Sequence, residues 1–267
     1  MSKVVFITGA SSGLGLAIAE YLSKNGHIVY GTSRKSILPA GDVKMLVADV
    51  TDQESLERAI AKIIAERGRL DVVVNNAGLG IASPVETAPI QDVQRVLDTN
   101  VTGVLRVIQT VAPIMRLQKS GLIINISSIG SEIGLPYRGI YSASKAAVDR
   151  LTEALRTELA PFGVQACTIQ PGGVQTDINK NRLRVELPEE SVYRESFDRS
   201  YDLINQSVEK GMEANEFGKL VLHIIQQKKV KALYRLGNKT EKLSVLLKRI
   251  LPAHTFEKMI RKHYGLK

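Results

Sequence analysis

Short apolar, β-branched runs alternate with segments of helical periodicity along most of the chain. The runs are Lys3–Thr8, His27–Ser33, Val43–Ala48, Leu70–Asn75, Leu122–Ser127 and Gln165–Gln170. Between them, apolar residues recur at i, i+3 and i+4 in Gly13–Asn25, Gln53–Arg67, Val93–Gln118 and Ser142–Pro161. Because parallel strands need crossover helices, this order predicts an α/β protein with a parallel sheet covered on both faces.

Residues 177–215 interrupt this alternation. The segment is polar and charged, and it is longer than ordinary connections between strands and helices. A helix over Glu216–Lys228 and a strand over Ala232–Leu236 then resume the pattern. Because no linker divides the chain, we expect one domain that carries a long insertion.

The basic residues are concentrated near the C-terminal end. The net charge is +9, but residues 228–267 alone contain twelve Lys or Arg residues and two acidic ones. The rest of the chain is close to neutral, which argues against a nucleic-acid-binding surface there. Cys167 is the only cysteine, no signal peptide is evident, and no run of about 18 apolar residues could span a bilayer. We expect a cytoplasmic protein that needs no disulfide.

A glycine-rich turn follows the first expected strand and opens the first expected helix. It reads Thr8-Gly9-Ala10-Ser11-Ser12-Gly13-Leu14-Gly15, with the spacing G-x-x-x-G-x-G. Glycines allow the backbone to approach a pyrophosphate, whose charge is stabilised by the free N–H groups of the helix N-terminus. A tight turn without a ligand is the alternative. The turn predicts a dinucleotide site made by Gly9, Ser11, Ser12, Gly13, Leu14 and Gly15.

A second group of residues has the chemistry of an acid–base catalyst. Tyr141 and Lys145 lie four residues apart in an expected helix, so the ammonium can lie near the phenol and favour its ionised form. Such a tyrosine can act as a general acid or base. Ser127 and Ser128 end the fifth expected strand, at the edge where open α/β sheets bind ligands. Chance surface packing is the alternative for the Tyr–Lys pair.

Six features occur together in one order along the chain. They are the glycine turn, Asn75-Asn76-Ala77-Gly78, Asn100 within Thr99-Asn100-Val101-Thr102-Gly103, a serine thirteen residues before Tyr141, the Tyr141/Lys145 pair, and Pro171-Gly172-Gly173-Val174. In these features the chain resembles the short-chain dehydrogenase/reductase family over about residues 3–237. The resemblance implies a single doubly wound sheet of the Rossmann type and no metal. It also implies a catalytic set of Asn100, Ser128, Tyr141 and Lys145, and so selects Ser128 over Ser127.

The same resemblance implies a role for each of these residues. Tyr141 gives a proton to a carbonyl oxygen while a nicotinamide delivers hydride, and Ser128 hydrogen-bonds that oxygen. Lys145 binds the nicotinamide ribose and favours the phenolate, and Asn100 holds a water on the proton path. Further cofactor contacts are implied for Asp49, Val50, Asn76, Ala77, Gly78, Pro171, Gly172, Val174 and Thr176, together with Tyr141 and Lys145.

The end of the second expected strand bears on the choice of cofactor. An NAD-preferring protein of this kind places an acidic residue there to hold the adenosine 2′-hydroxyl, but Tyr30–Lys35 contains no Asp or Glu. Arg34 can instead pair with a 2′-phosphate and stack on the adenine, with help from Ser11, Ser12 or Lys35. A solvated basic turn is the alternative. The sequence predicts NADP(H).

The regions that vary within the family indicate a hydrophobic substrate. The stretch Gly134-Leu135-Pro136 resembles the 17β-hydroxysteroid dehydrogenase branch, and the run that contains it is expected to place Ile133, Leu135 and Tyr137 near the catalytic pair. Residues 177–215 are expected to form a lid. In a basic C-terminal extension, residues 238–267, apolar residues recur at helical spacing, first Leu243, Leu246, Leu247, Ile250 and Leu251, then Phe256, Met259, Ile260 and His263. These faces pack on the protein or a partner subunit, or they contact an anionic membrane surface.

These inferences predict an NADP(H)-dependent enzyme that interconverts a hydrophobic ketone, steroid-like or lipid-like, and a secondary alcohol. The catalytic part is expected over residues 1–237, with the extension attached to the same domain. A β-ketoacyl thioester reductase and a non-catalytic, membrane-associated cofactor-binding scaffold are the alternatives. The resemblance implies a homodimer or homotetramer, and peripheral membrane contact through the basic extension stays open.

Overall fold

A seven-stranded parallel sheet forms the centre of the computed structural model, which describes residues 2–36, 41–176 and 181–266. In spatial order its strands are β11 (Leu233–Leu236), β7 (Val164–Pro171), β6 (Gly121–Ile126), β4 (Val72–Asn75), β1 (Val4–Ile7), β2 (Ile28–Ser33) and β3 (Lys44–Val47). The strand order reverses at β1, which pairs with both β2 and β4. Such a reversal opens a crevice at the carboxyl ends of the strands, where α/β sheets bind ligands. The predicted doubly wound α/β fold is confirmed.

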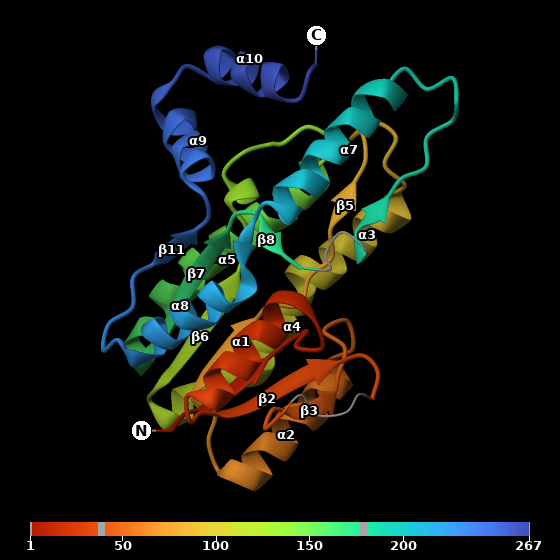
Figure 1. Ribbon diagram of the computed structural model, residues 1–267. Helices are drawn as coiled ribbons and strands as arrows, with labels where there is room; N and C mark the ends of the chain where they lie inside the picture. Colours follow the sequence, from red (N-terminus) through yellow and green to blue (C-terminus); the bar gives the residue numbers. More distant parts are fainter. Residues whose placement is uncertain (1, 37–40, 177–180, 267) are drawn as a thin grey trace.

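Helices cover both faces of the sheet (Figure 1). On one face, α1 (Gly13–Lys24) and α8 (Ala214–Gln226) pack together, and their Ile18 and Phe217 join a core cluster with Val5 of β1. On the other face lie α2 (Gln53–Arg67), α4 (Gly103–Gln118) and α5 (Gly139–Leu159), which share a second cluster with Phe6. Successive residues of β1 thus enter opposite cores, as the period of two in a strand requires.

The helix predicted over Val93–Gln118 is present, but it begins at Ile90 and is not a regular α-helix throughout. The structure divides it into α3 (Ile90–Leu97), a π-helical turn over Asp98–Thr102, and α4. A π-turn adds one residue to the helical turn and redirects the side chains within it, and such turns are frequent at functional sites. Here the redirected residue is Asn100, which is fully buried.

Two small strand pairs attach the predicted lid to the rest of the protein. β9 (Leu183–Arg184) pairs with β5 (Ile81–Ala82), and β10 (Met212–Glu213) pairs with β8 (Val174–Gln175). Between β9 and β10 lies α7 (Arg194–Glu209), whose Phe197 is buried in a third core cluster with Ile81. Residues 177–180, with which the predicted lid begins, lie outside the described residues.

The C-terminal extension forms two helices, α9 (Lys239–Ile250) and α10 (Ala253–His263). Figure 1 shows both of them (blue) near one end of the sheet, on the same side as α7. None of the described helices combines the length and the apolar character that crossing a bilayer requires.

The predicted apolar stripe of α9 is only partly correct. Val245, which it omitted, is the buried residue of this helix and packs with Phe256 of α10 against Ile129 and Ile133. Leu247 and Leu251 pack against the same cluster. Leu243, Leu246 and Ile250 are instead 50%, 53% and 64% exposed. The helix is therefore rotated relative to the stripe, because the cluster it covers lies on its Val245 side.

Candidate active site

A large cavity opens at the carboxyl ends of the central strands. Its volume is about 1430 Å³, more than a pocket for one drug-sized ligand usually offers. It extends from the glycine turn after β1 to α9 and α10. All of the predicted site residues except Gly15 and Asn100 line it. The structure therefore brings together residues that are spread over most of the sequence.

The glycine turn fits a bound pyrophosphate. Gly9 and Gly13 have φ of +65° and +55°, in the left-handed region that favours glycine. A Cβ atom at Gly15 would lie 2.3 Å from the carbonyl oxygen of Gly9, so this glycine allows α1 to pack closely on the turn and does not reach the cavity. The side chain of Ser12, the N-cap of α1, forms no capping hydrogen bond, and the first turn contains no acidic residue. The backbone N–H groups there remain available to an anion.

Thr8 and Asn76 join the ends of β1 and β4 beside this turn. The Thr8 hydroxyl accepts hydrogen bonds from the backbone N–H groups of Asn76 and Ala77, both at 3.0 Å. The Asn76 amide donates to the carbonyl oxygens of Thr8 and Gly9, again at 3.0 Å. These four bonds fix the floor of the cavity. The sequence prediction omitted Thr8, although it opens the glycine motif.

The end of the cavity beyond β2 and β3 is the place expected for the adenosine. Arg34, exposed to solvent, follows β2, while Asp49 and Val50 follow β3, and all three residues line the cavity. Ser11 and Ser12 are exposed on the neighbouring turn. A cationic side chain therefore stands where an NAD site would have an acidic one.

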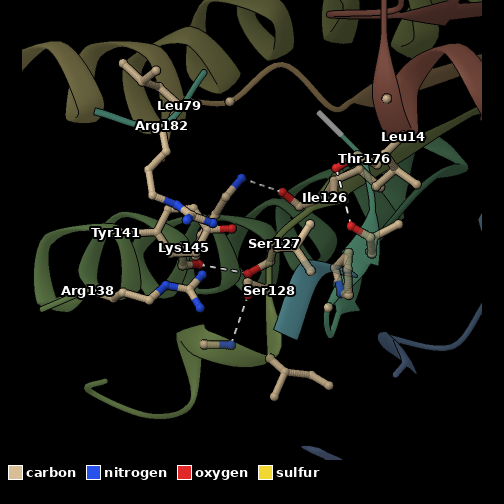
Figure 2. A pocket seen from close by; sticks show the side chains of 18 of the residues that line it. Leu14, Leu79, Ile126, Ser127, Ser128, Arg138, Tyr141, Lys145, Thr176 and Arg182 are labelled. Atoms are coloured by element: carbon tan, nitrogen blue, oxygen red, sulfur yellow. Dashed lines mark hydrogen bonds between the residues drawn. The ribbon is translucent and has the colours of Figure 1, made fainter. Parts of the chain in front are cut away.

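Ser128, Tyr141 and Lys145 lie together on one wall of the cavity (Figure 2). Tyr141 and Lys145 come from the first turns of α5 and are 9% and 5% exposed. The Lys145 ammonium donates to the carbonyl oxygen of Ile126 at 2.9 Å, which fixes the lysine against the end of β6. The three side chains thus form a compact group with a hydroxyl, a phenol and an ammonium.

The two adjacent serines differ in their hydrogen bonds. The Ser127 hydroxyl donates to the carbonyl oxygen of Lys145 at 3.0 Å, so it is engaged in holding α5 against β6. The Ser128 hydroxyl instead accepts from the backbone N–H of Gly130 at 3.0 Å. Its proton is therefore free to reach a ligand. The geometry favours Ser128 as the serine that can bind a substrate oxygen.

Asn100 does not reach the cavity. Its amide oxygen accepts from the backbone N–H of Leu79 at 2.7 Å, and its amide nitrogen donates to the Leu79 carbonyl oxygen at 2.9 Å and to the Ser144 hydroxyl at 3.0 Å. These bonds hold the segment after β4 against α5. The predicted role of holding a water stays a prediction, whereas the backbone-holding role is visible in the contacts.

The loop after β7 is held from the C-terminal extension. The carboxylate of Glu241, in the first turn of α9, accepts from the backbone N–H of Gly173 at 2.6 Å and from that of Asn238 at 2.8 Å. A Cβ atom at Gly172 would lie 2.0 Å from this carboxylate, so only glycine fits there. The sequence prediction missed Glu241. Its position three residues after Asn238 is a capping-box signal, but that signal marks a helix start and says nothing of Gly173.

The far end of the cavity is mostly apolar. It is lined by Ile129, Ile133 and Leu135 from the loop after β6, and by Leu243, Leu247, Phe256, Met259 and Ile260 from α9 and α10. Ile133 and Leu135 were predicted near the catalytic pair, and both line the cavity. Tyr137 was also predicted near the catalytic pair, but it does not line the cavity, because its ring packs edge-to-face on Phe197, with the centroids 5.4 Å apart.

Two arginines line the cavity near Tyr141, between the catalytic group and the apolar end. Arg138 precedes α5, Arg182 precedes β9, and both line the cavity. Figure 2 shows both side chains extending toward the Tyr141–Lys145 pair. Sequence reasoning gave neither residue a role, because no motif contains them.

Known proteins share these features. A family profile described as short chain dehydrogenase matches residues 3–186. Over 266 residues the chain is 40% identical to a 3-ketodihydrosphingosine reductase of Bacteroides thetaiotaomicron, with 99% of each chain covered. It is 36% identical over 230 residues to human 17-beta-hydroxysteroid dehydrogenase type 1, and this alignment covers 79% of this chain and 69% of the human protein. A solved structure described as ElxO with NADP bound superposes on this chain with a TM-score of 0.73 and 26% sequence identity. The superposition covers 88% of this chain and 97% of the ElxO chain.

These matches agree with the fold and with the order of the motifs. The profile spans more than half of the chain, and the Bacteroides relative matches it from end to end. The predicted resemblance is thereby confirmed, and the chain belongs to the short-chain dehydrogenase/reductase family of oxidoreductases.

Proposed function

We propose that this protein is an NADP(H)-dependent enzyme that reduces a hydrophobic ketone and, in the reverse direction, oxidises the corresponding secondary alcohol. The observation that carries the proposal is the convergence of Ser128, Tyr141 and Lys145 on one wall of a cavity that joins the glycine turn to an apolar end. A nicotinamide dinucleotide bound along the turn supplies or accepts the hydride.

The three side chains supply the proton and the electrostatic stabilisation. In reduction, the Tyr141 hydroxyl gives its proton to the substrate oxygen, and in oxidation it takes a proton back. The Ser128 hydroxyl donates to the same oxygen and stabilises the negative charge that develops on it. One N–H of Lys145 is used by the Ile126 carbonyl, so the other two are available to ribose hydroxyls and to the phenol.

Asn100 acts indirectly in this proposal. Its three hydrogen bonds hold the segment after β4 against α5, so they fix the distance between the cofactor-binding floor and Tyr141. Asn76, Ala77, Gly78, Pro171, Gly172, Val174 and Thr176 line the cavity between these two elements and are the proposed contacts of the ribose and nicotinamide.

NADP(H) is the proposed cofactor because of Arg34. Its guanidinium can pair with a 2′-phosphate at the end of β2, where no carboxylate is present to hold a 2′-hydroxyl. Ser11 and Ser12 are exposed nearby and can add hydrogen bonds. The NADP bound to the ElxO structure supports this choice.

A long-chain or polycyclic ketone is the proposed substrate. The apolar residues of α9 and α10 extend the cavity well beyond the space that a small ketone needs. The full-length relative is a reductase of 3-ketodihydrosphingosine, and the human relative is a 17-beta-hydroxysteroid dehydrogenase. Both names support a lipophilic substrate over a small polar one.

A homo-oligomer and a peripheral membrane contact are further parts of the proposal. Leu246 and Ile250 are more than half exposed on α9, beside the basic residues Lys242, Lys248 and Arg249. Such a surface can bind an anionic bilayer or a second subunit.

The test is NADPH oxidation by the purified full chain with a panel of ketones. The panel contains a long-chain 3-keto lipid, a steroid 17-ketone, a β-ketoacyl thioester and a small methyl ketone, each measured with NADPH and NADH. Turnover of the first two with NADPH supports the proposal, and preference for the thioester supports the β-ketoacyl alternative. NADPH binding without turnover of any ketone would favour the non-catalytic scaffold.

A further inference from the structure

Two guanidinium groups lie next to the proposed proton donor. The guanidinium carbon of Arg138 lies 4.9 Å from the centre of the Tyr141 ring. Arg182 lines the same cavity, and its guanidinium carbon lies 5.8 Å from the centre of the Tyr201 ring of α7. Figure 2 shows the two side chains reaching the Tyr141–Lys145 pair from different elements. With Lys145 they make the reaction end of the cavity strongly cationic.

Arg138 is held in place by an unusual backbone. Tyr137, directly before it, has a φ of +58°, in the left-handed region that a residue with a side chain seldom adopts. The Tyr137 ring is fixed on Phe197, its hydroxyl contacts that of Ser196 at 2.5 Å, and its carbonyl oxygen accepts from Ser83 at 2.9 Å. Backbone strain of this kind persists when the surroundings impose it, and it concentrates at functional sites.

Arg182 is held by the strand pair of the lid. The next residue, Leu183, donates its backbone N–H to the carbonyl oxygen of Gly80 at 2.9 Å, which begins the pairing of β9 with β5. The guanidinium donates to the Asn205 side chain of α7 at 3.0 Å. Arg182 is 9% exposed, and burial, followed by the charge of Arg138, lowers its pKa from the ordinary value.

The acidic residues among the described lining of the cavity do not neutralise the guanidinium groups of Arg138 and Arg182. Of the acidic residues that line it, Asp98 pairs with Arg106, Glu241 binds backbone N–H groups near Gly173, and Asp49 binds Thr51. None of the ion pairs between described residues involves Arg138 or Arg182. Arg182 is thus buried without a carboxylate partner among the described residues, and a buried charge is costly unless a ligand or another group compensates it.

We propose that the substrate is an anionic amphiphile, which places a carboxylate or phosphate between Arg138 and Arg182, a few bonds from its carbonyl, and an apolar chain against α9 and α10. This inference rests on the proposed function and names the substrate class of the same site. Planar guanidinium groups pair with either oxyanion in bidentate geometry. The same two charges disfavour a protonated amine beside the carbonyl, so the inferred headgroup differs from that of 3-ketodihydrosphingosine, the compound named for the Bacteroides relative.

Binding measurements test the anion site without requiring turnover. Decanoate, decyl phosphate, decanol and decylamine are titrated by calorimetry into the full chain saturated with NADP⁺, so that the phosphate sites of the cofactor are already occupied. We expect the two anions to bind at least about tenfold more tightly than the alcohol and the amine. The preferred anion identifies the headgroup, carboxylate or phosphate.

Variants show whether these two arginines cause the preference. Arg138→Gln and Arg182→Gln should each reduce the ratio of anion to alcohol affinity, and the double variant should abolish it, whereas Arg182→Lys should retain part of it. Arg150→Gln is the matched control, because it removes the same charge from the exposed face of α5. Arg150 pairs there with Glu153. The control should bind the anions like the wild type.

Two results would overturn the inference. One is equal or tighter binding of decylamine or decanol than of decanoate and decyl phosphate to the wild type. The other is an anion preference that the folded double variant retains. Failure of the proposed function is a separate result, because it would appear as no oxidation of NADPH with any keto acid, keto phosphate or neutral ketone while the anions still bind.

Discussion

The Tyr141 side chain combines a ring that is almost fully buried with a position on the cavity wall. Removing its hydroxyl should therefore remove the proton donor without changing the packing of the ring. We expect Tyr141→Phe to bind NADPH nearly as the wild type does and to lose at least about 10²-fold in kcat, the lower range for a general acid. Steady-state kinetics and a fluorescence titration of NADPH measure the two quantities. Near-normal turnover by the folded variant would contradict the assignment.

Arg34 lies at the other end of the cavity and should decide between the two cofactors. Arg34→Asp replaces a partner of the 2′-phosphate by an acceptor for a 2′-hydroxyl. A charge-assisted hydrogen bond contributes roughly 1.5–3 kcal/mol, so the ratio of kcat/KM for NADPH over NADH should fall about tenfold or more. Lys24→Asp, at an exposed position of α1 that does not line the cavity, is the control for the change of charge. An unchanged ratio in Arg34→Asp would place the phosphate elsewhere.

Asp149, also on α5, gives a pH dependence of stability. Burial raises the pKa of its carboxyl more than hydrogen bonds from Ser131 and Gln170 lower it. The folded state therefore prefers the protonated acid, and the resulting stabilisation is complete below the unfolded value of about 3.9 and lost as the pH rises through the folded pKa. We expect the Tm of Asp149→Asn, relative to wild type, to increase with pH across this range. A pH-independent difference in calorimetry would show that the carboxyl does not titrate in this way.

The sheet and the helices that cover it could be predicted from the sequence, but the irregular parts of the fold could not. The spacing of apolar residues and the residues of turns are local signals that the sequence displays directly. The range predicted from them for α2, Gln53–Arg67, agrees with the structure. The π-turn that interrupts Val93–Gln118 has no local signal, because long-range bonds of Asn100 to Leu79 and Ser144 stabilise it.

The same distinction applies to the site. Motif residues such as Ser128 and Tyr141 were predicted because their spacing is specific. Arg138, Arg182 and Glu241 were not, because each reaches the cavity through contacts with elements far away in the sequence. The rotation of α9 was also unpredictable, since Ile129 and Ile133 determine which of its faces is buried.

Glu241 links α9 to the loop that is proposed to hold the nicotinamide. Glu241→Gln leaves a neutral side chain with a single oxygen, which cannot accept from both Gly173 and Asn238 as the carboxylate does. We expect a loss of about 1–3 kcal/mol of stability and a several-fold higher KM for NADPH. Glu257→Gln, on the exposed side of α10, removes the same charge without such contacts and should change neither quantity. Wild-type values in Glu241→Gln would show that this link does not position the loop.

The two C-terminal helices, α9 and α10, complete the fold as well as the cavity. Val245 and Phe256 are 2% and 3% exposed in a cluster with Ile129 and Ile133. Deleting Thr240–Lys267 should expose this cluster and release Gly173 from Glu241. We therefore expect a lower Tm, aggregation or a smaller oligomer, and weaker binding of NADPH, measured by calorimetry, size-exclusion chromatography and titration.

Vesicle binding separates this packing role from a membrane role. If Leu246 and Ile250 contact lipid, the intact protein should bind anionic vesicles, each interfacial Lys or Arg should contribute about 1 kcal/mol, and added salt should weaken the binding. Leu246→Gln and Ile250→Gln leave the buried cluster untouched and should reduce that binding without changing Tm. An intact protein that does not bind such vesicles would leave the extension with its packing role alone.

The division of the cavity between two parts of the chain has an evolutionary consequence. The residues proposed for proton and hydride chemistry come before residue 177, whereas much of the apolar wall comes from α9 and α10. Substitutions in these terminal helices can therefore alter the length or width of the accepted chain while the reaction itself is preserved. Glu241 limits this freedom, because its carboxylate must stay in place for Gly173. Among descendants of one ancestral gene, we expect α9 and α10 to diverge rapidly around a glutamate at this position.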